Sequence, residues 1–213
     1  MPAVNIEHQP GGSVIAVWEI TETEETLVQH LSMPDSCLAE IMLTANPQRR
    51  LERLAVQALL NKLAGEKACL RHHANGKPFL LNSTLNISIS HTKGFAAVMY
   101  NEKHPVGCDM ECLTRNFSAV EKKALSKKER RYLSHPHRNL QLCLLWCAKE
   151  AIYKCVEEDG VDFARQIFVE KFTPEEKGKL IAIYTNNKGE ETKFELHYKT
   201  IDEHVLVWTV NNE

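Results

Sequence analysis

The chain has 213 residues, of which 43% are hydrophobic and 25% are charged. This size and composition predict a globular protein with a hydrophobic core and exclude the disordered and fibrous classes. The formal net charge of -2 excludes a general attraction to nucleic acid or to an anionic membrane surface, so an anion-binding site must be local.

The sequence shows neither an apolar run long enough to cross a membrane nor a signal peptide, and we therefore expect a cytoplasmic protein with no membrane partner. Its cysteines are Cys37, Cys69, Cys108, Cys112, Cys143, Cys147 and Cys155. Their odd number and the lack of a Cys-x-x-Cys pair disfavour a disulfide framework and a zinc ribbon. We predict reduced thiols, most of them small core residues.

In chain order, hydrophobic periodicity and turn residues predict a first group of elements. They are a strand at 13–20, helices at 24–31, 35–42 (with Asp35 as N-cap) and from Asn46-Pro47 to about Gly65, and strands at 68–72, 78–81, 86–90 and 95–100. The second group is a strand at 106–111, a basic helix at 126–133, a long helix at 139–156, and strands at 163–171, 179–184, 194–200 and 204–210. The order of strand, helices and strands thus occurs twice. We predict an α+β fold of two similar halves, residues 1–103 and 104–213, packed against each other.

Two short patterns bring acidic and basic groups together. Asp109 and Glu111 are two residues apart in a predicted strand, a spacing that points both to one face. Trp146, Glu150 and Lys154 form one stripe of the long helix, whose other positions are largely apolar. Alone, each pattern is also typical of an ordinary solvent-facing strand or a surface ion pair. Together, the three carboxylates would form a hard-oxygen site suited to magnesium or manganese and poorly suited to zinc.

Taken jointly, these stretches resemble the 4′-phosphopantetheinyl transferase superfamily, whose signature is Gly-x-Asp-x-Glu followed by Trp-x-x-Lys-Glu-Ala-x-x-Lys. The matching residues are Gly107, Asp109, Glu111, Trp146, Lys149, Glu150, Ala151 and Lys154, with upstream matches at Gly76-Lys77-Pro78 and Ser90-His91. The resemblance covers residues 45 to 160, approximately. Because Ser90-His91 precedes Gly107, the chain resembles the double-length, surfactin-synthetase-activating type, which implies a monomeric pseudo-dimer with the phosphopantetheinyl transferase fold.

The resemblance implies transfer of 4′-phosphopantetheine from coenzyme A to a serine of an apo acyl, peptidyl or aryl carrier protein, with release of 3′,5′-ADP. Such carriers serve fatty acid, polyketide or nonribosomal peptide biosynthesis. The implied metal ligands, for magnesium or manganese, are Asp109, Glu111 and Glu150. The implied catalytic residues are Glu150, Lys154 and Asp109. The implied coenzyme A contacts are Arg50, Lys77, Pro78, Ser90, His91 and Lys154. Of the neighbouring arginines Arg49, Arg50 and Arg53, which remain alternatives, Arg50 is favoured to reach the 3′-phosphate. The alternative is a non-catalytic homologue that binds coenzyme A or a carrier protein.

Two further segments have expected roles. We expect 113–125 to dock the carrier protein through exposed Phe117 and Val120 and through Lys122 and Lys123, which would attract an acidic partner. The basic run at 126–131 would suit nucleic acid, but its interrupted charge and single flanking aromatic residue favour a solvated helix face.

Cys147 lies where the family commonly has small or hydroxyl residues. With no adjacent His to activate it, we predict a structural role.

Overall fold

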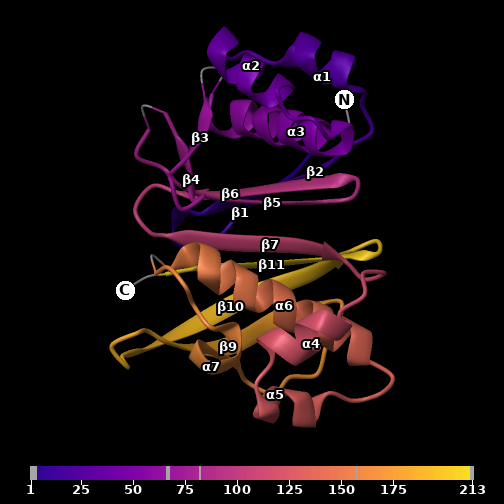
Figure 1. The fold of residues 1–213 in the computed structure, drawn as a ribbon, viewed down its shortest axis with the longest axis vertical. Helices are drawn as coiled ribbons and strands as arrows, with labels where there is room; N and C mark the ends of the chain where they lie inside the picture. Colours follow the sequence, from indigo (N-terminus) through magenta and orange to yellow (C-terminus); the bar gives the residue numbers. More distant parts are fainter. Residues whose placement is uncertain (1–3, 66–67, 82, 157, 212–213) are drawn as a thin grey trace. The chain divides into compact units, whose positions relative to one another are not determined.

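A computed structural model describes residues 4–65, 68–81, 83–156 and 158–211 (Figure 1). The chain divides into two compact units, Met1–Lys103 and His104–Glu213. Within the described residues, no helix is long and apolar enough to cross a membrane.

The first unit is a four-stranded antiparallel sheet of order β1-β2-β6-β5, covered by helices. Its elements are β1 (Val4–His8), a 3-10 turn η1 (Pro10–Gly12), β2 (Val14–Glu19), α1 (Glu24–His30), α2 (Asp35–Met42), α3 (Pro47–Ala64), β3 (Leu70–His72), β4 (Pro78–Leu80), β5 (Asn86–Thr92) and β6 (Phe95–Asn101). Strands β3 and β4 form a separate hairpin.

Helix α3 begins and ends where its sequence predicts. The Asn46 side chain accepts a hydrogen bond from the Arg49 N–H, Pro47 occupies the first turn, and Gly65 follows the last turn with φ 94°. The buried side chains of α3, which include Leu54 and Leu59, pack against β2, β5 and β6. At α2, by contrast, the cap position is Pro34 and Asp35 is already helical, so the predicted Asp35 cap is wrong.

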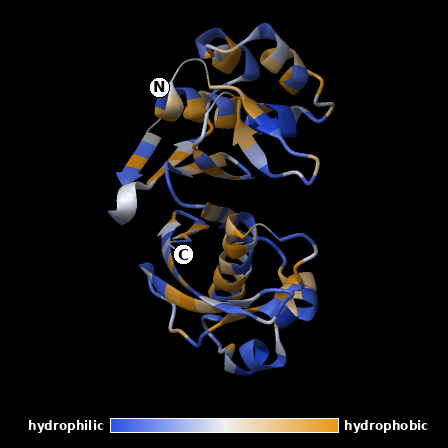
Figure 2. Ribbon diagram, turned by 90° about the vertical axis from the view of Figure 1, so that its left-hand side faces the viewer, coloured by the Kyte–Doolittle hydropathy of each residue, from blue (hydrophilic) through white to orange (hydrophobic). Residues whose placement is uncertain are grey.

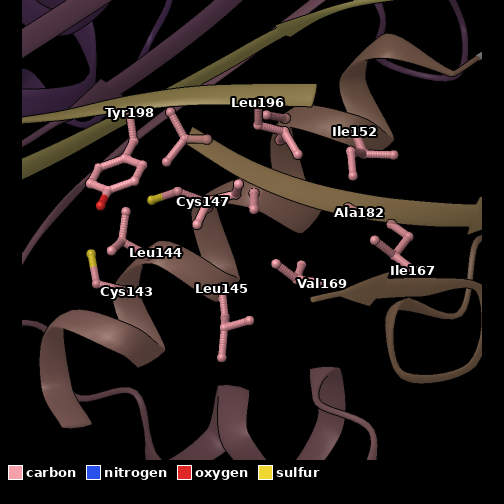
Figure 3. Packing of buried hydrophobic residues seen from close by; sticks show 14 of the residues in the cluster. Cys143, Leu144, Leu145, Cys147, Ile152, Ile167, Val169, Ala182, Leu196 and Tyr198 are labelled. Carbon is pink, nitrogen blue, oxygen red and sulfur yellow. The ribbon is translucent and has the colours of Figure 1, made fainter. Parts of the chain in front are cut away.

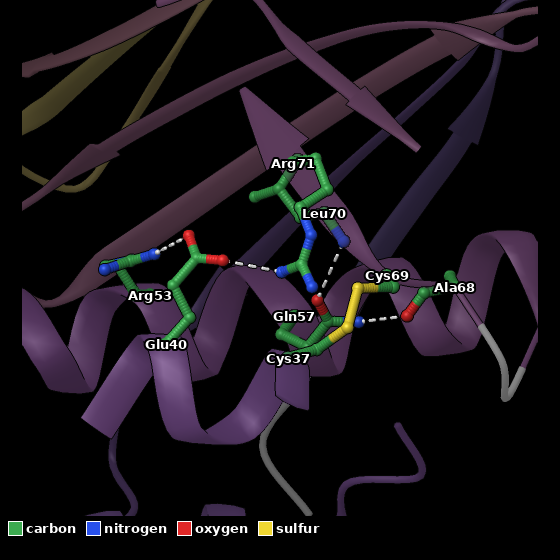
Figure 4. The surroundings of a disulfide bond; sticks show 8 residues. All are labelled: Cys37, Glu40, Arg53, Gln57, Ala68, Cys69, Leu70 and Arg71. Atoms are coloured by element: carbon green, nitrogen blue, oxygen red, sulfur yellow. Dashed lines mark hydrogen bonds and ion pairs between the residues drawn. A yellow bond between two sulfur atoms is a disulfide. The ribbon is translucent and has the colours of Figure 1, made fainter. Parts of the chain in front are cut away.

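One prediction about the cysteines is also wrong. Cys37 of α2 and Cys69, which precedes β3, form a disulfide, while the other five cysteines are free (Figure 4). The two partners are 32 residues apart. Spacing rules for local motifs, on which the prediction rested, contain no information about a pair that the packing of α2 beside β3 brings together.

The second unit is a five-stranded antiparallel sheet of order β7-β11-β10-β9-β8, with α6 packed on one face (Figure 1). Its elements are β7 (Val106–Cys112), α4 (Ser118–Ala124), α5 (Lys127–Tyr132), α6 (Arg138–Cys155), α7 (Phe163–Gln166), β8 (Ile167–Val169), β9 (Lys177–Thr185), β10 (Glu191–Ile201) and β11 (His204–Val210). The strand predicted at 163–171 is in fact α7 followed by β8. Asp162 caps α7 by accepting hydrogen bonds from the N–H groups of Ala164 and Arg165.

The core of the second unit forms between α6 and its sheet. Figure 2 shows hydrophobic residues along α6 and along these strands. Figure 3 shows the helix residues Cys143, Leu144 and Cys147 among apolar side chains of the strands. Eleven of the 18 residues of α6 are buried, and the polar ones among them require partners.

The two units share one feature of chain topology, although their sheets differ in the number of strands. In each, the strand that precedes the helices pairs antiparallel with the unit's last strand, β2 with β6 and β7 with β11. The mixed α+β class is confirmed, and the shared topology supports two similar halves. Their predicted arrangement as a pseudo-dimer stays a prediction.

Gly107 allows α6 to approach β7 closely. A Cβ atom at this position would lie 1.8 Å from the carbonyl oxygen and 2.8 Å from the carbonyl carbon of Ala151, both backbone atoms of α6. We expect Gly107→Ala to lower the free energy of unfolding by about 1–3 kcal/mol or more, because the helix must move away from the strand. Urea denaturation measures this loss. Gly178→Ala is the control, because its new Cβ would meet only the Tyr198 side chain. Equal effects of both substitutions would contradict the prediction.

Candidate functional site

Asp109 and Lys154 form a partly buried ion pair between β7 and α6. Asp109 is 6% exposed, and its Oδ1 lies 2.7 Å from the Lys154 Nζ. The same ammonium group donates to the carbonyl oxygen of Cys108 at 3.0 Å. Burial lowers the pKa of Lys154, but the opposing effect of Asp109 and of other nearby groups is larger and raises this pKa overall, which favours the ammonium form. Lys154 thereby fixes the aspartate carboxylate and neutralises part of its charge.

Glu150 lies one helical turn before Lys154 and is partly buried. Burial, and then the negative charge of Asp109, raise the pKa of Glu150 to about 7, while the charges of Lys154 and Arg115 act in the opposite direction. A carboxyl group with this pKa exchanges a proton near neutral pH, which is the property required of a general base or acid.

Glu111 is held by Arg115, a residue that the sequence analysis did not single out. The Arg115 guanidinium forms an ion pair with the Glu111 carboxylate and lies 5.3 Å from the ring centre of Trp146 and 5.7 Å from that of Phe117. Spacing offers no signal for this pair, because a separation of four residues brings side chains together in a helix, whereas Glu111 lies in β7 and Arg115 follows that strand. Trp146 therefore orients a cation beside the acidic residues, which gives the aromatic position of the helix motif a local role.

The three carboxylates predicted to bind a metal come from two elements: Asp109 and Glu111 belong to β7, and Glu150 belongs to α6. Within the part of the chain that the structure describes, no group of three or more His, Cys, Asp or Glu side chains is arranged to hold a metal ion. The chemistry of the donor set nevertheless fits a hard divalent cation, since Asp109 and Glu150 are close enough for one charge to raise the pKa of the other. A bound cation would relieve this repulsion.

Lys149, which the helix motif also contains, lies away from these acids. Its Nζ is fully buried, 2.9 Å from Oε1 of the equally buried Glu129, and donates to the carbonyl oxygens of Phe163 and Ile167. Glu129 also accepts hydrogen bonds from the N–H groups of Ser126 and Val169. The expectation of a solvated face at 126–131 is thus wrong for Glu129. Its signal was the Ser-x-x-Glu capping box that begins α5.

Apart from Lys154 on α6, the candidate coenzyme A residues lie in the first unit. His91 Nδ1 is 3.0 Å from Glu52 Oε2 and 3.3 Å from a terminal nitrogen of Arg49. Arg50, predicted to reach a phosphate, instead pairs with Glu24 at 2.7 Å and donates to the Thr44 carbonyl oxygen. The remaining candidates lie at the hairpin turn before β4 (Lys77), at the start of β4 (Pro78) and on β5 (Ser90, buried). Arg49, with its side chain 58% exposed, is thus the arginine that lies beside His91.

The predicted docking segment is only partly exposed. Phe117 is 2% exposed and Val120 is 6% exposed, and both belong to the core of the second unit. The prediction that these two side chains are exposed is therefore wrong. Residues 117, 120 and 124 share one face of α4, and this face packs inward, whereas Lys122 and Lys123 remain exposed.

Comparisons with known proteins agree with the motifs. Residues 105–209 match the 4′-phosphopantetheinyl transferase superfamily. A protein of Haemophilus influenzae (strain ATCC 51907 / DSM 11121 / KW20 / Rd), named "Putative 4'-phosphopantetheinyl transferase", is 32% identical over 116 residues. This match covers 50% of the present chain and 49% of the relative, so the chain spans about half the length of the curated protein that it matches.

Proposed function

Because the matched part of the chain, residues 105–209, belongs to the 4′-phosphopantetheinyl transferase superfamily, we propose that this protein transfers the 4′-phosphopantetheine group of coenzyme A to a serine of an apo acyl, peptidyl or aryl carrier protein. The other product would be 3′,5′-ADP. The observation that carries the proposal is the Asp109–Lys154 ion pair beside Glu150, whose pKa is raised to about 7. A protein that only bound coenzyme A would not need this arrangement of a base next to a fixed cation.

In the proposed reaction, Glu150 takes the proton from the carrier serine, directly or through one water molecule. The serine oxygen attacks the β-phosphorus of coenzyme A, and the bond to the 3′,5′-ADP oxygen breaks. Lys154 has two roles. Its ammonium group donates a hydrogen bond to the Asp109 carboxylate, and its positive charge stabilises negative charge on the transferred phosphoryl group. Asp109, Glu111 and Glu150 would hold magnesium or manganese, with Glu111 exchanging its contact with Arg115. When bound, the metal would offset the charge of the pyrophosphate group.

Intact-mass spectrometry of an apo acyl carrier protein tests the function. Incubation with this protein, coenzyme A and magnesium should add one phosphopantetheine mass, and EDTA should abolish the addition. If no carrier protein gains mass although coenzyme A binds, the protein is instead a binding homologue. The monomeric, pseudo-dimeric state expected of the double-length type is a separate prediction, which the molecular mass in solution checks.

For coenzyme A binding, we propose that Arg49 and His91 act together with Lys77, Pro78 and Ser90. The position of Arg49 beside His91 predicts that Arg49→Gln weakens coenzyme A binding by about tenfold or more, because one charge-assisted contact to a phosphate is worth about 1.5–3 kcal/mol. Arg50→Gln should change the affinity less, since its guanidinium is held by Glu24 and Thr44. Isothermal titration with coenzyme A measures both variants. A larger loss for Arg50→Gln would return the phosphate contact to Arg50.

For carrier docking, we propose that Lys122 and Lys123 on the exposed side of α4 attract the partner. Reversing both charges should raise the KM for an acidic carrier protein several-fold at low salt and leave kcat nearly unchanged, because exposed charges mainly steer association. The effect should shrink as salt is added. Charge reversal at Lys188, on the turn between β9 and β10, is the control. An unchanged KM would exclude this docking surface.

A further inference from the structure

The stripe of small residues on α6 that faces β7 is in register with that strand. The Sγ of Cys155 donates to the Pro105 carbonyl oxygen at 3.3 Å, and the Ala151 backbone lies against Gly107. Four residues along a helix span about 6 Å, and two residues along a strand span about 6.6 Å. Moving back four residues along α6 therefore corresponds to moving forward two residues along β7. The next step of this register places Cys147 opposite Asp109.

The surroundings of Cys147 agree with this register. Its side chain is fully buried, and the Cys143 thiol and the Asp109 carboxylate are the neighbouring polar groups close enough to influence its thiol. Figure 3 shows Cys143 and Cys147 among apolar residues, one helical turn apart on α6.

Asp109 is thus held from two positions of the same helix. Lys154 contacts its Oδ1, and Cys147 approaches the carboxylate from almost two turns earlier. A carboxylate that binds a metal or a phosphate-linked ligand works best when its orientation is fixed in advance by neighbouring donors. A thiol beside the carboxylate can both fill this buried space and donate to a carboxylate oxygen, and the two contributions are separated by the variants below.

We propose that Cys147 is a positioning residue that, together with Lys154, fixes the Asp109 carboxylate for metal binding. The inference rests on the proposed function only in taking Asp109 as a metal ligand. It also accounts for a thiol within the helix motif without assigning it nucleophilic chemistry.

Three variants test the inference through binding of Mn²⁺, followed by electron paramagnetic resonance of the free ion. Cys147→Ala should weaken Mn²⁺ binding by about tenfold or more, the lower end of the range for neighbours that orient metal ligands. Cys147→Ser should restore the affinity, because a hydroxyl group is also a donor. Cys155→Ala removes a thiol from the same face of α6 whose Sγ donates to the Pro105 carbonyl oxygen, and it should leave the affinity unchanged.

Wild-type Mn²⁺ affinity in Cys147→Ala would overturn the inference. It would also be overturned if Cys147→Ser, folded with an unchanged melting temperature, bound Mn²⁺ as weakly as Cys147→Ala, since the residue would then contribute only packing. Modification of a carrier protein by the wild-type chain is measured in parallel. If the wild-type chain modifies no carrier protein but the three variants bind Mn²⁺ as expected, only the proposed function is refuted. If the wild-type chain is active but the variants do not show the expected Mn²⁺ affinities, only the role of Cys147 is refuted.

Discussion

Glu150→Gln is expected to lower kcat for carrier modification by about 10²–10⁴-fold, the usual contribution of a general base, while the protein keeps its fold. Glutamine has nearly the same shape as glutamate but accepts no proton. Glu150 is partly exposed on α6, so its replacement leaves the core of the second unit intact. The substitution also removes the repulsion between Glu150 and Asp109, and the melting temperature should therefore not fall.

The control for this variant is Glu195→Gln. Glu195 is an exposed residue of β10 that pairs with Lys179 at 2.7 Å. Strand β11 separates β10 from β7, which carries Asp109 and Glu111. This variant should retain wild-type kcat and KM. If Glu150→Gln lost less than tenfold in kcat, or if only its KM changed, Glu150 would be a binding residue and another group would have to take the serine proton.

The sequence predicted the elements of the site better than their contacts. The spacing of Asp109 and Glu111 in a strand, and of Glu150 and Lys154 in a helix, follows from the periods of the two structures, and both are confirmed. Periodicity does not specify the register between helix and strand, however. That register depends on the close approach at Gly107, and it decides that Lys154 meets Asp109 and that Cys147 faces the same carboxylate.

The errors have a common physical origin. Phe117 and Val120 precede and begin a short helix whose polar residues suggested an exposed segment, yet one side of that helix completes the core. Cys37 and Cys69 were judged by local spacing, although their bond depends on how α2 packs beside β3. Arg50 was favoured over Arg49 without knowledge of Glu24, which holds Arg50 from another helix. In each case a tertiary contact decides the role of a residue whose local pattern allows several.

Lys149→Met is expected to destabilise the second unit more than any other single change considered. It would leave Glu129 as an uncompensated buried charge, and breaking one side of a buried ion pair costs about 3–5 kcal/mol. It would also remove the donor to the carbonyl oxygens of Phe163 and Ile167, which connect α6 to α7 and β8. In a protein of this size, the melting temperature should fall by roughly 6–20 °C.

A double-mutant cycle shows whether the ion pair causes this loss. Glu129→Gln removes the buried negative charge while its side chain can still accept a hydrogen bond from Val169 or Ser126. The double variant should therefore lose less stability than the two single variants together, by a coupling free energy of about 0.5–3 kcal/mol. Lys179→Met is the matched control, because it breaks an exposed lysine–glutamate pair worth about 0–1 kcal/mol. Losses that simply add would mean that Lys149 contributes through its packing and its carbonyl contacts, and not through Glu129.

Glu150 follows Lys149 directly in α6. Activity lost in Lys149→Met below its melting temperature would therefore indicate that the buried Lys149–Glu129 pair also keeps Glu150 in its position beside Asp109.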